Sequence, residues 1–175
     1  PSSTGKTAEA FADALIGLLD LLQVADAVVV GISAGGPTAL QLAGRHPGRV
    51  SKVILQSAIT AGKFPTGLAR AGAYCLFNPV VERWVWAGFR ACGRIAPQLA
   101  LKSMLRGLSS LPPQRVLAAM SPDQRRGALA LLLACRSGSG FLHDMQHRCG
   151  DLGRVPAPTL IIESEYDGSK DPSHA

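Results

Sequence analysis

The strongest constraint on the fold is an alternation of helix and strand patterns within the first sixty residues. Residues 7–24 repeat leucine and phenylalanine at spacings of three and four, which predicts an amphipathic helix. Residues 27–32, Ala-Val-Val-Val-Gly-Ile, are typical of a strand buried on both faces of a parallel sheet. A second helical pattern over 37–45 and a second strand pattern over 52–57 follow. Because parallel strands need a crossover between them, the alternation predicts an α/β domain.

The middle of the chain has a different pattern. Leucine, alanine and arginine recur at helical spacing over 62–150, with prolines between the runs, which predicts about four short helices. Residues 156–163 then restore the strand pattern. We therefore expect 1–61 and 151–175 to form an α/β core and 62–150 to form an all-helical insertion.

Composition narrows the class of protein. The chain has 175 residues, 47% apolar and 17% charged, which suits one globular domain and excludes a disordered tail. The net charge of +6 comes from the middle segment, where 62–150 holds twelve Lys and Arg against three Asp and Glu. No aromatic interleaving accompanies these cations, so we interpret them as a solvated helical surface and expect no nucleic-acid partner.

Cysteine spacing and hydropathy indicate the setting. Cys75, Cys92, Cys135 and Cys149 fit no zinc pattern, so we predict reduced cysteines, no metal and no cofactor. The apolar run 128–135 has eight residues, whereas a membrane span needs about 20, so no transmembrane segment is expected. Nothing resembles a secretory signal, and we expect a cytoplasmic protein. The sequence is silent on the oligomeric state.

One motif carries chemistry. Gly31-Ile32-Ser33-Ala34-Gly35 reads G-x-S-x-G and lies between a predicted strand and a predicted helix, the context of a nucleophile elbow. The strained turn projects the serine hydroxyl above the sheet, and small residues two before and two after the serine let neighbouring backbones approach. The Ala34 N–H, at the helix N-terminus, is placed to bind an oxyanion. The alternative interpretation is a glycine turn whose serine caps the helix.

These residues resemble the α/β-hydrolase family. Ala27–Gly36, followed by Arg45-His46-Pro47, resembles the family's elbow block, and Pro158–Ile162 with Asp167 resembles the block that carries the catalytic acid. The resemblance implies a partial α/β-hydrolase fold with a parallel sheet core, in which 62–150 is an inserted helical cap. It also implies that the chain is a fragment that lacks the N-terminal strands.

The resemblance assigns a catalytic triad in part. It implies Ser33 as the nucleophile and Asp167 as the triad acid, with Asp171 and Glu165 as competitors that fit the pattern less well. A serine needs a histidine to take its proton, and the family's histidine lies beyond the acid, after a further strand. We therefore place the catalytic histidine outside this chain.

The four histidines in the chain have other expected roles. His174 matches the start of the helix that follows the acid, and His46 belongs to a His-Pro helix stop. His143 and His147 are four residues apart, a spacing that suits a metal, but without a third ligand we expect them to pack in the cap. His143 and Asp144 are candidates for the lining of the substrate cleft.

The expected function is hydrolysis of an ester or related acyl bond in a mostly apolar small molecule, through an acyl-enzyme. A non-catalytic ligand-binding member of the family and a cofactor-free haloperoxidase-like member are the alternatives. Nucleotide binding would rest on Gly5-Lys6-Thr7 alone, which lacks the first glycine and the strand of a phosphate-binding loop. We expect the 175 residues alone to be inactive, because the histidine and the second oxyanion donor are outside them.

Overall fold

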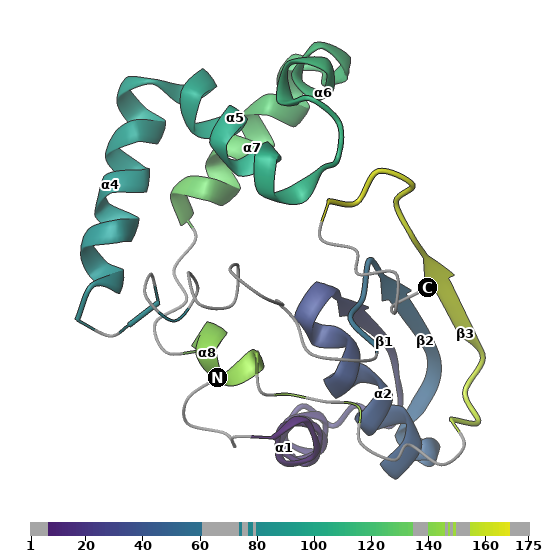
Figure 1. Ribbon diagram of the computed structural model, residues 1–175. Coiled ribbons are helices and arrows are strands. Elements are labelled where there is room, and N and C mark those ends of the chain that lie inside the picture. Colours follow the sequence, from purple (N-terminus) through teal and green to yellow (C-terminus); the bar gives the residue numbers. More distant parts are fainter. Residues whose placement is uncertain are drawn as a thin grey trace. The chain divides into compact units, whose positions relative to one another are not determined.

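The computed structural model describes residues 7–60, 74, 77–78, 80–134, 140–145, 147, 149 and 155–168. The chain divides into two compact units, one made of 1–70, 139–164 and 171–175, the other of 71–138 and 165–170. The first unit contains a β-sheet and the second contains a set of helices, as Figure 1 shows.

A parallel sheet forms the centre of the first unit. Strands β1 (Ala27–Ile32), β2 (Val50–Gln56) and β3 (Thr159–Ile162) are arranged in the order β1-β2-β3. The predicted α/β class and its parallel sheet are confirmed. The strand predicted over 27–32 has those bounds, whereas the second begins two residues earlier than predicted because it already pairs with β1 at Val50.

Two longer helices accompany the sheet. Helix α1 (Ala8–Leu21) begins at an N-cap formed by Thr7, whose hydroxyl oxygen accepts a hydrogen bond from the Ala10 N–H at 3.2 Å. Helix α2 (Gly36–Arg45) ends before a 3₁₀ turn at Pro47–Arg49, since proline cannot continue the helical hydrogen bonding. A short helix, α8 (Gly140–Asp144), belongs to the same unit although the sequence pattern groups it with the helical insertion.

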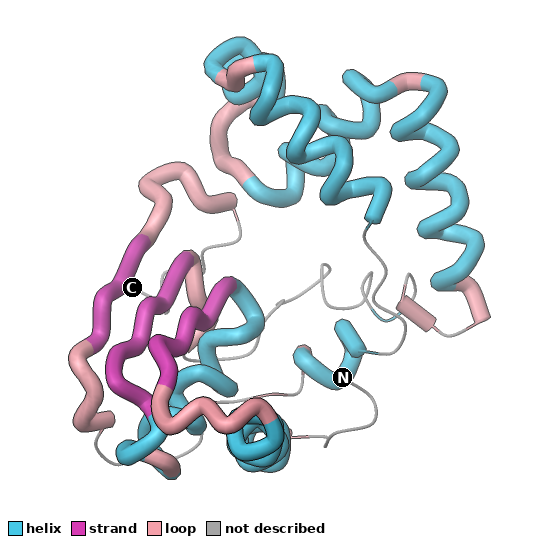
Figure 2. The backbone as a smooth tube through the Cα atoms, turned by 180° about the vertical axis from the view of Figure 1, so that it is seen from behind, coloured by secondary structure: helices cyan, strands magenta, loops and turns pink. Residues whose placement is uncertain are grey.

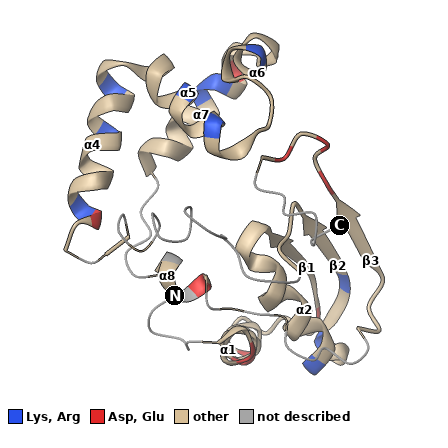
Figure 3. Cartoon of the chain, in the orientation of Figure 1, with Lys and Arg blue, Asp and Glu red and all other residues tan. Residues whose placement is uncertain are grey.

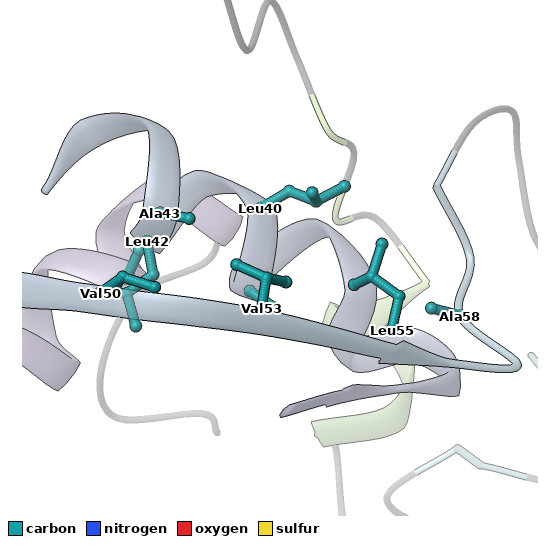
Figure 4. Close-up of a cluster of buried hydrophobic side chains, with 9 residues drawn as sticks. Leu40, Leu42, Ala43, Val50, Val53, Leu55 and Ala58 are labelled. Atoms are coloured by element: carbon teal, nitrogen blue, oxygen red, sulfur yellow. The ribbon is translucent and has the colours of Figure 1, made fainter. Parts of the chain in front are cut away.

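The core of the first unit lies between α2 and β2. Figure 4 shows the side chains of the helix meeting those of the strand, and the buried set comprises Ala39, Leu40, Leu42, Ala43, Val50, Val53, Leu55 and Ala58. Ala12 of α1 joins this cluster and is fully buried. Val53 on the central strand is 1% exposed and pairs in register with Val29 of β1 and Thr159 of β3. The core therefore lies on one face of the sheet, where α2 packs against β2.

A buried polar contact fixes the segment before β3 to this core. The Gln41 side-chain nitrogen of α2 donates to the Cys149 carbonyl oxygen at 2.5 Å. Burial raises the pKa of the Cys149 thiol to about 11, so this cysteine stays protonated at neutral pH. Cys92 and Cys149 are both free thiols, and Cys75 and Cys135 lie outside the described residues.

The opposite face of the sheet exposes apolar side chains. Val28, Val30 and Ile32 alternate along β1 and are 51%, 50% and 58% exposed, and Leu160 of β3 is 54% exposed. Parallel sheets are normally covered on both faces. In the part of the chain that the structure describes, only one face is covered.

The described part of the second unit contains helices α4 (Glu82–Ile95), α5 (Pro97–Leu108), α6 (Pro113–Ala119) and α7 (Pro122–Ala134). Figure 2 shows these helices from behind. Three of them begin at a proline, whose missing N–H costs nothing in the first helical turn. Gly93 gives α4 and α7 a close contact, because a Cβ there would lie 2.9 Å from a Leu133 methyl carbon. The prolines at the starts of α5, α6 and α7 separate these helices from the ones before them, as the sequence predicts.

None of the helices in the described part of the chain is both long enough and apolar enough to cross a bilayer.

An ion-pair cluster joins α1 to the end of α2. The Asp13 carboxylate accepts hydrogen bonds from Arg45 at 3.1 and 2.7 Å and contacts the His46 ring nitrogen at 2.7 Å. The hydrogen bond from Arg45, and to a lesser extent that from His46, holds the pKa of the Asp13 carboxyl below the ordinary value of an aspartate. Because the pKa of Asp13 is lower in the folded than in the unfolded state, the ion pair stabilises the fold at pH values above the unfolded-state pKa. This stabilisation is lost as the pH falls through the folded-state pKa.

We expect Asp13→Asn to lower Tm at pH 7 by only on the order of 1 °C, because Asp13 is 44% exposed and solvent screens the pair. At an acidic pH below the lowered pKa of Asp13, the two proteins should melt together, since the wild-type carboxyl is then protonated. Circular dichroism melts at both pH values check this, with Asp26→Asn, at an exposed carboxylate, as the control. A Tm difference that persists at low pH would contradict the assignment.

Candidate active site

Ser33 occupies a strained turn at the carboxyl end of β1. Its φ is +50°, in the left-handed region that non-glycine residues seldom adopt. Its carbonyl oxygen accepts hydrogen bonds from the Gly36 N–H and, at 3.0 Å, from the Ile59 N–H, which fix the turn in place. The side chain of Ser33 is exposed. This is the strand–turn–helix geometry that a nucleophile elbow requires.

Close backbone packing around the turn depends on Gly31 and Gly36. A Cβ on Gly31 would lie 2.8 Å from the Ala39 Cβ, and a Cβ on Gly36 would lie 2.4 Å from the Ile59 carbonyl oxygen. At Gly35 no described atom lies within 4 Å of the added carbon. The expectation of a close approach two residues after the serine is therefore wrong, because the tight contact falls one residue later, where α2 begins against the loop after β2.

Ala34 lies in a single 3₁₀ turn (η1, Ser33–Gly35) that leads directly into α2. The first N–H groups of a helix have no acceptor within the helix, and the helix dipole places partial positive charge at this end. Ala34 is half-buried, beside the exposed serine. The arrangement can therefore present a backbone donor to a negative oxygen near Ser33.

A second serine lies at the same edge of the sheet. Ser57 follows β2, has a φ of +43°, and donates its backbone N–H to the Ile162 carbonyl oxygen at 2.8 Å. Carboxyl ends of parallel strands meet at one edge, which is where α/β proteins bind ligands. The sequence did not single out Ser57, because no glycine pattern surrounds it.

Asp167 belongs to the second unit, whereas Ser33 belongs to the first. The acid follows β3 and forms an antiparallel bridge with Ser109 at the end of α5, reinforced by the Gly168 N–H donating to the Leu108 carbonyl oxygen at 3.1 Å. Gly168 is required there, since a Cβ would lie 2.8 Å from the Ser109 carbonyl carbon. The pairing of Asp167 with a catalytic histidine stays a prediction.

The other candidates are placed as follows. Glu165 lies in the turn before Asp167 and is exposed, while Asp171 and His174 lie outside the described residues, as do Gly5 and Lys6. His46 contacts Asp13 in the ion-pair cluster, which agrees with a structural role.

A cavity of about 270 Å³ lies beside the elbow, within the first unit. Ala34 and Gly35 line it together with Phe11 of α1, and Asp144 and His147 supply its ionisable groups. The His147 ring nitrogen Nδ1 lies 3.9 Å from an Asp144 carboxylate oxygen, and the imidazole is 2% exposed. Asp144 thus lines a cavity near Ser33.

Sequence reasoning missed the position of His147. The only signal for His147 in the sequence is its spacing of four residues from His143. The side chain of His143 lies outside the described part of the structure. No group of three or more potential metal ligands occurs among the described residues. His147 thus contributes a buried imidazole to the cavity that Ala34 and Gly35 line, and this imidazole lies close to the Asp144 carboxylate.

Comparison with known proteins agrees with this geometry. The family model "alpha/beta hydrolase fold" matches residues 2–72. The uncharacterized hydrolase YcgS of Bacillus subtilis (strain 168) is 36% identical over 163 residues, which cover 90% of this chain and 57% of YcgS. An α/β hydrolase fold protein from Nakamurella multipartita has a TM-score of 0.76 at 24% identity, covering 99% of this chain and 63% of that one.

A thermophilic esterase from Thermogutta terrifontis shares the fold more distantly. Its TM-score is 0.56 at 18% identity, with 96% of this chain and 57% of that chain covered. The parallel sheet, the turn at Ser33 and these matches together show that the chain belongs to the α/β-hydrolase family. The chain spans 57% of the length of YcgS.

Proposed function

We propose that this chain carries the nucleophile of a serine hydrolase, which cleaves an ester or related acyl bond of a mostly apolar small molecule. The observation that carries the proposal is the exposed Ser33 with a φ of +50° at the junction of β1 and α2. A serine held in this strained conformation has an energetic cost that packing must offset, and such strain is concentrated at functional sites. The relative YcgS is described as a hydrolase, which agrees with the proposal.

In the proposed mechanism, the Ser33 hydroxyl oxygen attacks the substrate carbonyl carbon while a histidine outside this chain takes the hydroxyl proton. The Ala34 N–H stabilises the negative charge that develops on the carbonyl oxygen. The histidine passes its proton to the leaving group as the tetrahedral intermediate collapses to the acyl-enzyme. Water then attacks the acyl carbon and regenerates the serine, with Asp167 orienting the histidine throughout.

The test of the proposal is covalent labelling of Ser33 by a fluorophosphonate in the protein with its full natural sequence. A haloperoxidase-like member with the same triad would also be labelled, and bromination of a dione substrate in the presence of bromide and peroxide would separate it from an esterase. A non-catalytic ligand-binding member would fold and remain unlabelled.

Asp167→Asn tests the triad acid. We expect kcat to fall by about 10³- to 10⁴-fold, because an amide stabilises the wrong histidine tautomer and cannot balance the imidazolium charge. Steady-state hydrolysis of a p-nitrophenyl ester measures the loss, and Glu165→Gln, two residues away and exposed, is the matched control. If Glu165→Gln produced the large loss and Asp167→Asn did not, the acid would be Glu165.

We also propose that the 175 residues by themselves have little or no hydrolase activity. The proposed base and the second oxyanion donor are not assigned to any residue of this chain. Ester turnover by the 175 residues that Ser33→Ala removes would contradict this. In that case His147, buried beside the elbow cavity, would be the first base to test, by His147→Gln.

A further inference from the structure

The second unit contains a cavity of its own, about 410 Å³ in volume, between α5, α6 and α7. Its apolar wall includes Leu101 of α5, Leu117 of α6 and Leu129 of α7, and Leu101 is 4% exposed. Sites for small organic molecules commonly have volumes of about 300–1,000 Å³ and mostly apolar linings. The cavity therefore has the size and the lining of a small-molecule site.

Cations surround this apolar wall. Lys102 is half-buried among the lining residues, and Arg125 and Arg126 line the cavity from α7. The Arg125 side chain donates to the Leu117 carbonyl oxygen at 2.5 Å, which positions the guanidinium group and leaves other N–H donors for a ligand. The charge of Arg126 is neutralised by an exposed ion pair with Asp123, so Lys102 and Arg125 are the cations available to a ligand.

The surrounding charge also favours an anion. Residues 82–134 hold eight Lys and Arg against Glu82 and Asp123 alone, and Figure 3 shows the basic residues distributed over these helices. None of the described residues that line the cavity is acidic. An occupant that satisfies both the leucine wall and the cations needs an apolar body and a negatively charged head.

We propose that this cavity binds a single-chain amphipathic carboxylate, of the fatty-acid class. The apolar chain packs against Leu101, Leu117 and Leu129, and the carboxylate accepts hydrogen bonds from Arg125 and Lys102. Arginine is suited to this role, because its planar fork matches the two oxygens of a carboxylate. The site is built entirely from the helical unit and goes beyond the proposed hydrolysis at Ser33.

Isothermal titration of the full chain with monomeric dodecanoate tests the proposal. We expect saturable binding that weakens at least about 10-fold in the double variant Lys102→Gln/Arg125→Gln, because both charge-assisted hydrogen bonds are removed. Arg115→Gln removes the same kind of charge from exposed α6 outside the cavity, and it should change Kd less than about 2-fold. Dodecyltrimethylammonium, with the same chain and the opposite charge, should not compete.

Three results would overturn the proposal. The first is equal affinity in the double variant and in Arg115→Gln, with both variants showing wild-type circular dichroism and Tm. The second is equal binding of the cationic amphiphile, which would make the cavity an unselective apolar surface. The third is binding to vesicles of anionic phospholipid without binding to monomeric dodecanoate, which would assign the cations to a membrane surface.

Discussion

Replacing Ser33 with alanine is expected to abolish fluorophosphonate labelling and to lower ester hydrolysis by about 10³-fold or more in the protein with its full natural sequence. The hydroxyl oxygen of Ser33 is the atom that forms the acyl bond in the proposed mechanism, and alanine removes only that oxygen. Because alanine and serine have similar backbone preferences, the left-handed turn should persist, and circular dichroism should be unchanged. Gel-based labelling and p-nitrophenyl ester kinetics measure the two losses.

Ser57→Ala is the matched control for this experiment. Ser57 also follows a parallel strand and also has a positive φ, but no helix begins directly after it. We expect its replacement to leave labelling in place and to change kcat/KM by less than about 10-fold, since it removes no reacting atom. Full labelling of a folded Ser33→Ala protein, or loss of labelling only in Ser57→Ala, would show that the nucleophile is not Ser33.

Gly36→Ala should cause the largest loss of stability among the substitutions at the elbow. The new Cβ would lie 2.4 Å from the Ile59 carbonyl oxygen and 3.1 Å from the Ala58 Cβ, so the loop after β2 must move. That movement strains the hydrogen bond from the Ile59 N–H to the Ser33 carbonyl oxygen. We expect a loss of about 3 kcal/mol, the upper end of the usual cost of overpacking, measured by urea denaturation.

Gly35→Ala is the control one residue away. Gly35 has a φ of −78° and a ψ of −10°, which alanine adopts readily, and no described atom lies within 4 Å of the added Cβ. Its stability should therefore change by no more than about 1 kcal/mol. If the two variants were equally stable, or if Gly35→Ala were the weaker protein, the packing assigned to Gly36 would be wrong.

Much of the first unit is predictable from the sequence, because its signals are local. The valine run over 27–32 has the bounds of β1, and α1 lies within the helical pattern predicted over 7–24. The turn at Ser33 between a strand and a helix was also predictable, since strand, serine and helix are contiguous in the chain. Side-chain periodicity and capping depend on residues a few positions apart, so one sequence suffices to identify them.

Contacts between segments that are distant in the sequence could not be predicted from it. No local pattern places α8 and His147 with the sheet unit, or brings His147 to the cavity that Ala34 lines, more than a hundred residues away in the chain. The cavity between α5, α6 and α7 was also hidden, because each helix shows only its own apolar stripe. Which stripes face one another is decided by packing, and packing depends on the complete three-dimensional arrangement.

Gly35 and Gly36 show which features the sequence determined and which the tertiary structure determined. The sequence by itself determined that a serine follows an apolar strand, precedes a helix and stands among glycines, because these are relations between neighbours along the chain. Only the tertiary structure decided that Gly36, and not Gly35, is the position without room for a side chain. The physical reason is that Ile59, which excludes a Cβ there, comes from the loop after another strand and approaches α2 only once the parallel sheet has formed.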